Sequence, residues 1–113
     1  MPLGTGVLRF IVPNRRETRV PMEVGVRISG HLSTPGTETT FTENVSSRGA
    51  RIISTRRWKT NDHLTIATLT GSFQALARVA YCQATPETGF AVGVEFLRPQ
   101  GEWVVRGTSA VLH

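Results

Sequence analysis

The feature that most constrains the fold of this chain is the alternation of apolar residues at every second position. From Val20 to Ile28 the apolar side chains alternate with mostly polar or small residues, and the same pattern recurs from Phe90 to Phe96. A period of two residues places the apolar side chains on one face of an extended strand. Helical periodicity is weak throughout the sequence. The pattern therefore predicts an all-β protein whose first strand runs continuously over Val20–Ile28.

Further strands are predicted over four other segments, and turn-forming residues separate them. The predicted strands cover residues 39–45, 50–54, 63–69 and 73–82, and the loops cover residues 30–40 and 83–89. A small open sheet leaves unpaired backbone groups at its edges, and closure into a barrel removes them. We therefore expect a six-stranded antiparallel β-barrel. The weakly patterned residues from Gln100 onward are expected to form a short helix or an extended cover around Trp103.

Length and composition indicate one globular domain without a membrane span. The chain has 113 residues, 39% of them hydrophobic, and a mean hydropathy of −0.10, which is ordinary for a soluble domain. The apolar stretch at residues 6–13 is interrupted by Arg9 and is too short to span a bilayer. We expect a cytoplasmic protein with an arm over residues 1–19, a barrel over 20–98 and a tail over 99–113.

The residues that usually carry metal or catalytic chemistry are sparse. Cys82 is the single cysteine, which excludes an intramolecular disulfide, and the three histidines lack ligand spacing. Asp62 and His63 are adjacent at a predicted turn, where a turn residue followed by a strand start is the simpler interpretation. No nucleophile motif or phosphate-binding glycine loop is present. We expect no metal site, no cofactor and no enzymatic activity.

The charge of the chain permits an anionic partner. The net charge is +5, and of the 13 basic residues only Lys59 is lysine. A guanidinium fork binds phosphates and guanine edges, although arginine-favouring codons explain the same excess. Three arginines, Arg15, Arg16 and Arg19, lie within five residues. The other arginines, among them Arg56, Arg57, Arg78 and Arg98, are interpreted as solvated surface.

A second polar cluster lies between two predicted strands, in the segment Asn44-Val45-Ser46-Ser47-Arg48-Gly49. Asn44 can both donate and accept hydrogen bonds, and Ser46 carries a hydroxyl. Gly49 permits either a backbone with positive φ or the close approach of a ligand. The same three residue types are also common in ordinary turns, so this segment gains meaning only together with the arginine cluster.

Together the two clusters resemble the PilZ domain, the bacterial receptor module for cyclic di-GMP. Arg15-x-x-x-Arg19 matches the family's RxxxR segment, and Asn44-x-Ser46-x-x-Gly49 matches its [D/N]xSxxG segment. About one RxxxR pair is expected by chance in so arginine-rich a chain, whereas the second segment is a roughly one-in-forty accident. The resemblance covers residues 14–97. It includes Arg19-Val20-Pro21 at the start of the first strand and Gly93-Val94-Glu95-Phe96 in the last strand.

The resemblance implies a six-stranded PilZ-like β-barrel that binds cyclic di-GMP. Arg15 and Arg19, helped by Arg16, would contact guanine and phosphate. Asn44 and Ser46 would hydrogen-bond the ligand, and Gly49 would have a conformational role. Ligand binding would alter the arm and so signal to a downstream protein partner that the sequence does not identify.

The sequence leaves two other functions open. One is a PilZ-like protein–protein adaptor that does not bind the nucleotide. The other is a barrel that binds single-stranded nucleic acid, which is disfavoured because the aromatic residues are few and Phe73, Phe90 and Phe96 fall at strand-interior positions.

Overall fold

The structure is a computed structural model that describes residues 18–87 and 89–105. Within these ranges the chain forms seven strands: β2 (Val20–Pro21), β3 (Gly25–Ser29), β4 (Thr37–Ser46), β5 (Gly49–Ser54), β6 (His63–Thr68), β7 (Gln74–Ala84) and β8 (Phe90–Gln100). All the strand pairings are antiparallel. These ranges contain no helix that is long and apolar enough to cross a membrane. The all-β prediction is confirmed.

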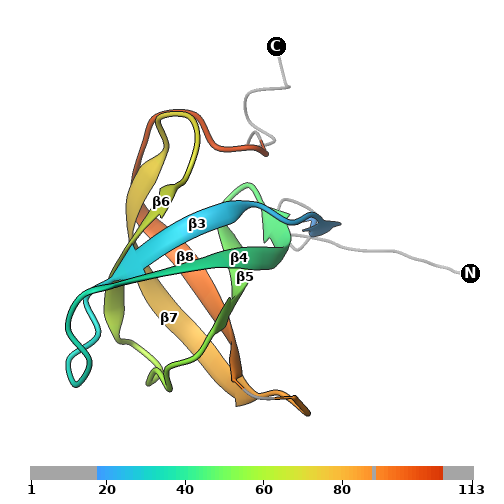
Figure 1. The fold of residues 1–113 in the computed structure, drawn as a ribbon. Helices are drawn as coiled ribbons and strands as arrows, with labels where there is room; N and C mark the ends of the chain where they lie inside the picture. Colours follow the sequence, from blue (N-terminus) through green and yellow to red (C-terminus); the bar gives the residue numbers. More distant parts are fainter. Residues whose placement is uncertain (1–17, 88, 106–113) are drawn as a thin grey trace, which may run out of the picture.

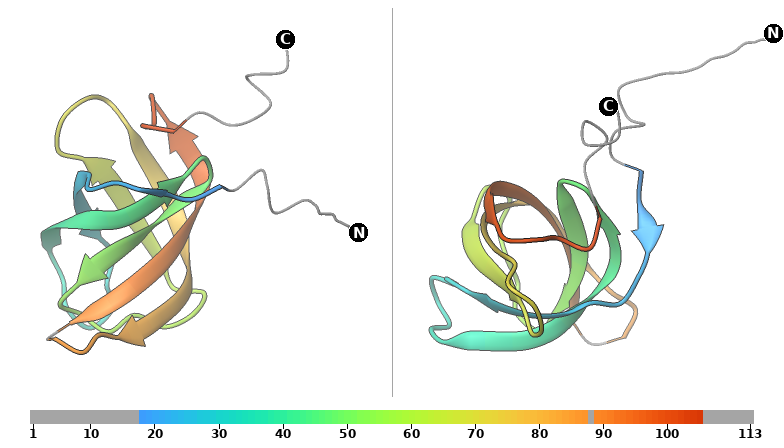
Figure 2. Two further views of the ribbon diagram at one scale, coloured as in Figure 1. Left: turned by 90° about the vertical axis from the view of Figure 1, so that its right-hand side faces the viewer. Right: turned by 90° about the horizontal axis from the view of Figure 1, so that it is seen from above.

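The sheet closes on itself because β5, at the end of the strand order, also pairs with β4. The order of the strands is β2-β4-β3-β6-β7-β8-β5, and β4 also pairs with β5. Six strands, β3 to β8, therefore form a closed barrel, and β2 adds to the β4 side of it. Figure 1 shows the barrel from the side, and the view from above in Figure 2 shows β2 outside the ring of strands. The predicted six-stranded antiparallel barrel is confirmed.

The core fills the inside of the barrel with aliphatic side chains. Alternation along β8 shows how one strand serves two faces: Val92 and Val94 belong to the buried core, whereas Gly93 and Glu95 belong to the outer face. Phe73 is buried, and Phe90 and Phe96 are partly buried against the core. The largest fully buried side chains are Ile28, Ile52, Leu64, Ile66, Val26, Val45, Val79 and Val92.

The prediction of one continuous strand over Val20–Ile28 is wrong, because the pairing with β4 is interrupted. Val20 pairs with Val45, and Gly25 pairs with Phe41, but the segment between β2 and β3 leaves the regular ladder. There the buried hydroxyl of Thr42 donates to the carbonyl of Met22 at 2.7 Å and accepts from the amide of Val24 at 2.9 Å. The Thr42 side chain thus takes the place of backbone partners for Met22 and Val24. The period-two pattern of the sequence cannot reveal such an exchange.

Two other expectations are refined by the structure. The loop predicted over residues 30–40 is shorter, since β4 already begins at Thr37. The part of the tail that follows β8 is a non-helical cover up to residue 105, with Trp103 and Val105 packed against the core.

The sequence also predicts a turn just before His63, and the φ angle of 76° at Asn61 agrees with it. The Asp62 carboxylate accepts the amide of Lys59 at 2.8 Å, which is a turn contact.

Three register shifts interrupt the ladders: one, at Leu76/Ala77, leaves an extra residue in β8, and the other two are bulges in the strands that flank the β5–β8 pair. In β4 the register shifts between Thr42 and Asn44, and in β7 it shifts between Val79 and Tyr81. A bulge inserts one extra residue and changes the direction in which nearby side chains point. In β7 the shift pairs Tyr81 with Gly93, so the ring lies on the outer face.

Substitution of Gly49 tests how closely β5 approaches β8. A Cβ atom at Gly49 would overlap the carbonyl oxygen of Val94, so the main chain of β8 would have to shift. We expect Gly49→Ala to lower the free energy of unfolding by about 1–3 kcal/mol in urea denaturation. Gly25→Ala is the matched control: it meets the flexible side chain of Leu69 at 2.9 Å. Equal losses in the two variants would contradict this interpretation of Gly49.

Candidate functional site

The segment from Asn44 to Gly49 forms the β4–β5 hairpin. Ser46 and Gly49 are partners across the two strands, so Ser47 and Arg48 make a two-residue turn. The Ser46 hydroxyl is buried, accepts the amide of Arg48 at 3.3 Å and donates to the carbonyl of Gly49 at 3.5 Å. The spacing between Ser46 and Gly49 is therefore that of a hairpin whose turn is stabilised by the serine side chain.

Arg19 connects the two polar clusters of the sequence. Its Nη1 donates a hydrogen bond to Oδ1 of Asn44 at 2.9 Å, across 25 residues of chain. Asn44 lies on β4, next to the pairing of β4 with β2, and Arg19 directly precedes β2. The predicted site residues Arg19, Asn44, Ser46 and Gly49 are thus brought together. Arg15 and Arg16 lie outside the described residues.

Gly49 is required for close packing and not for a positive φ. Among the described glycines, five others have a positive φ angle, whereas Gly49 lies in the regular pairing of β5 with β8, opposite Glu95. A Cβ atom there would overlap the carbonyl of Val94. Of the two reasons that the sequence suggested, the structure supports close approach, and the approaching group is the β8 backbone.

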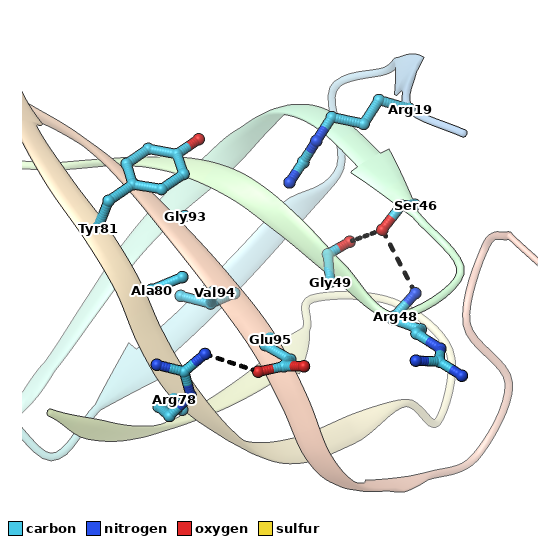
Figure 3. Close-up of a pocket in the computed structure, with 10 residues that line it drawn as sticks. All are labelled: Arg19, Ser46, Arg48, Gly49, Arg78, Ala80, Tyr81, Gly93, Val94 and Glu95. Atoms are coloured by element: carbon cyan, nitrogen blue, oxygen red, sulfur yellow. Dashed lines mark hydrogen bonds and ion pairs between the residues drawn. The ribbon is translucent and has the colours of Figure 1, made fainter. Parts of the chain in front are cut away.

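A hollow of about 210 Å³ lies on the outer face of the barrel beside these residues. Figure 3 shows Arg19 reaching toward it from one side, with Tyr81 at one end and the Arg78–Glu95 pair at the other. We call it the outer-face hollow, and its lining residues are Arg19, Ser46, Arg48, Gly49, Arg78, Ala80, Tyr81, Gly93, Val94 and Glu95.

Three arginines and one glutamate are among the residues that line the outer-face hollow. Arg78 donates to Glu95 at 2.8 Å and to the side-chain oxygen of Asn61 at 2.9 Å. The Arg78 and Glu95 side chains are 34% and 44% exposed, and ion pairs this exposed contribute at most about 1 kcal/mol. These two hydrogen bonds use two of the five N–H donors of Arg78, so the guanidinium can also contact an anion while it stays bonded to Glu95.

A hydrogen-bonded network on the same face holds the ring of Tyr81. Arg51 on β5 donates to Glu43 at 2.9 Å and to the Tyr81 hydroxyl at 3.2 Å. The hydrogen bond to Glu43, followed by the one to Tyr81, raises the pKa of Arg51 above its usual value. The ring lies over Gly93, where a Cβ atom would overlap it. The glycine is therefore what allows an aromatic ring to lie flat against β8.

Trp103 links the cover after β8 to the hairpin. Its Nε1 donates a hydrogen bond to the carbonyl of Ser46 at 2.7 Å, across 57 residues. Its ring centroid lies 4.7 Å from that of Phe73 and 4.9 Å from that of Phe96. The turn that carries Ser46 is consequently held from below by an aromatic cluster.

Four residues that line the outer-face hollow carry no recognisable signal of a site in the sequence. Arg78 reads as solvated surface although it lines the hollow, and the motifs do not indicate Arg48, Tyr81 or Glu95 as site residues. Glu95 alternates with the apolar residues of the last predicted strand, which indicates an outward position. The sequence does not say which strands lie beside it, so this signal could not assign it to a site.

The comparison with known families agrees with this geometry. The PilZ domain model matches residues 13–103, so the chain belongs to the PilZ domain family. PilZ domains are binding or adaptor domains, and they generally bind cyclic di-GMP. No significant match is found among curated protein sequences. Among the described residues, no group of His, Cys, Asp and Glu side chains is arranged to hold a metal ion.

Replacement of Trp103 tests the link between the cover and the hairpin. Trp103→Phe keeps most of the aromatic packing and removes the donor to the Ser46 carbonyl. We expect the free energy of unfolding to fall by about 1 kcal/mol, the usual net value of one hydrogen bond, in urea denaturation followed by circular dichroism. Val104→Ala, at an exposed neighbour, is the control. A stability equal to that of the wild type would show that this bond contributes nothing.

Proposed function

We propose that this protein is a cyclic di-GMP receptor that acts by binding alone. The observation that carries the proposal is the hydrogen bond from Arg19 to Asn44, which joins the two halves of the motif at the edge of the outer-face hollow. Arg15 and Arg16 would contribute further guanidinium groups from the preceding segment. The downstream protein partner is not identified by any feature of the chain.

The ligand chemistry fits the side chains around the outer-face hollow. Cyclic di-GMP carries two phosphates and two guanines, and each guanine presents adjacent O6 and N7 acceptors. A guanidinium fork binds that pair of acceptors, and it binds phosphate oxygens equally well. Arg19 and Arg78 both reach the hollow, so an anion there would be contacted from two sides.

The size of the hollow limits how the ligand would lie. Pockets that enclose a drug-sized ligand measure roughly 300–1,000 Å³, and the outer-face hollow measures about 210 Å³. A cyclic dinucleotide would therefore place one part in the hollow and the rest on the surface beside it. Three or four charge-assisted contacts, less the entropic cost of association, support roughly micromolar affinity, about −8 kcal/mol.

The same arrangement provides a signal. The arginines precede the barrel, and the groups that they would meet with the ligand lie on β4 and β5. Binding would draw the arm against the barrel wall and change the surface that a partner meets. The protein would thus be a ligand-gated adaptor.

Isothermal calorimetry with cyclic di-GMP tests the proposal directly. We expect roughly micromolar binding by the full chain. Arg19→Ala should weaken it about 5- to 150-fold, because one bidentate contact contributes on the order of 1–3 kcal/mol. Arg27→Ala removes the same charge from an exposed position on β3 that does not line the hollow, and it should leave the affinity unchanged.

The alternatives predict different results. An adaptor that does not bind nucleotides would give no heat with cyclic di-GMP. A barrel for single-stranded nucleic acid would shift an oligonucleotide in a gel, without competition by cyclic di-GMP. Either result, or equal losses of affinity in the two arginine variants, would contradict the proposed receptor function.

A further inference from the structure

The outer-face hollow contains a carboxylate that a purely anion-binding site does not need. Glu95 lines the hollow together with three arginines and is bonded to one of them, Arg78. Its negative charge weakens the attraction of the hollow for phosphate. Its hydrogen bond to Arg78 uses one of the roughly four lone-pair sites of a carboxylate. The remaining acceptor positions are available to a ligand that brings hydrogen-bond donors.

The surface next to Glu95 is shaped for a planar ring. Gly49, Gly93 and Ala80 line the hollow with little or no side chain. The ring of Tyr81 lies over Gly93, and Arg51 donates to its hydroxyl at 3.2 Å. The guanidinium carbon of Arg51 lies 5.7 Å from the ring centroid, toward the hydroxyl end, so a base would stack on the rest of the ring. A fixed aromatic face beside a shallow, small-residue surface is a place where a nucleobase stacks.

The spacing along β8 relates the ring to the carboxylate. Gly93 and Glu95 are two residues apart on the outer face, and two residues of strand span about 7 Å. The Tyr81 ring itself fills the space over Gly93, so a base would stack on the outward side of this ring. Displaced along β8 toward Glu95, such a base would have an edge beside the carboxylate. Figure 3 shows the two side chains at opposite ends of the hollow, with Gly93 and Val94 between them.

We propose that Glu95, positioned by Arg78, accepts the N1–H and N2–H₂ donors of a guanine stacked against Tyr81, and thereby selects guanine over adenine. The inference rests on the proposed cyclic dinucleotide function and assigns base selectivity within that site. An ionised carboxylate only accepts hydrogen bonds. Guanine presents two adjacent donors on this edge, whereas adenine presents an acceptor at N1, which the carboxylate repels.

Two other roles for Glu95 make different predictions. As a mere cross-strand partner of Arg78, with which it is in register, Glu95 would affect stability and not selectivity. As an electrostatic gate that keeps anions out, it would weaken the binding of every cyclic dinucleotide, and Glu95→Gln would bind each of them more tightly.

Calorimetry of the full chain with three ligands separates these roles. Cyclic di-IMP keeps O6, N7 and N1–H but lacks the 2-amino group, and cyclic di-AMP lacks both donors in this arrangement. The wild type should bind cyclic di-GMP about tenfold more tightly than cyclic di-IMP, and cyclic di-AMP more weakly still. In Glu95→Gln the affinity for cyclic di-GMP should fall about tenfold, to the level of cyclic di-IMP.

Glu87→Gln, in the exposed loop between β7 and β8, is the matched control and should behave as the wild type. If the wild type binds cyclic di-GMP and Glu95→Gln keeps or gains affinity with the same preference over cyclic di-IMP, the inference is overturned and the receptor function stands. If the wild type binds no cyclic dinucleotide, the receptor function fails and the inference fails with it.

The aromatic face is tested by a second pair of variants. Tyr81→Phe keeps the ring and loses the hydroxyl contact with Arg51, so the affinity for cyclic di-GMP should change by less than about threefold. Tyr81→Ala removes the stacking surface and should cost about tenfold or more. Thermal melts confirm that both variants fold. Equal affinities in the two folded variants would contradict stacking against Tyr81.

Discussion

Strand β4 pairs with both β3 and β5, and this double pairing closes the sheet into a barrel. Closure divides every strand into an inner and an outer face. The inner side chains form the core, among them Ile52 on β5 and Val92 on β8. The outer face then becomes a continuous surface on which residues from β4, β5, β7 and β8 lie side by side. The outer-face hollow lies on this surface, where β8 pairs with β5 on one side and with β7 on the other.

The two β-bulges give this surface its local shape. At the β4 bulge Glu43 falls between the paired residues Thr42 and Asn44, and its carboxylate reaches Arg51. At the β7 bulge the shifted register brings Tyr81 opposite Gly93. Bulges are common beside binding sites because they redirect side chains without breaking the sheet. Here one bulge lies on each side of the β5–β8 pair.

The sequence predicted the strands and half of the site for identifiable reasons. Period-two alternation locates strands well where both neighbours are regular, as in β8, and fails between β2 and β3, where the Thr42 side chain replaces backbone partners. The motif predicted that Arg19 and Asn44 act together, and they are hydrogen-bonded. Arg78 and Glu95 could not be assigned, because their proximity follows from the register of two long strands.

The alternation of β8 means that the core and the candidate site restrict insertions and deletions in the same strand. Val92 and Val94 face inward, and Gly93 and Glu95 face outward. Insertion or deletion of a single residue within this strand would exchange the two sets, burying the carboxylate and exposing the valines. Length variation among descendants of this sequence should accordingly accumulate in the loops, such as residues 30–36, and be rare in the part of β8 from Val92 to Glu95.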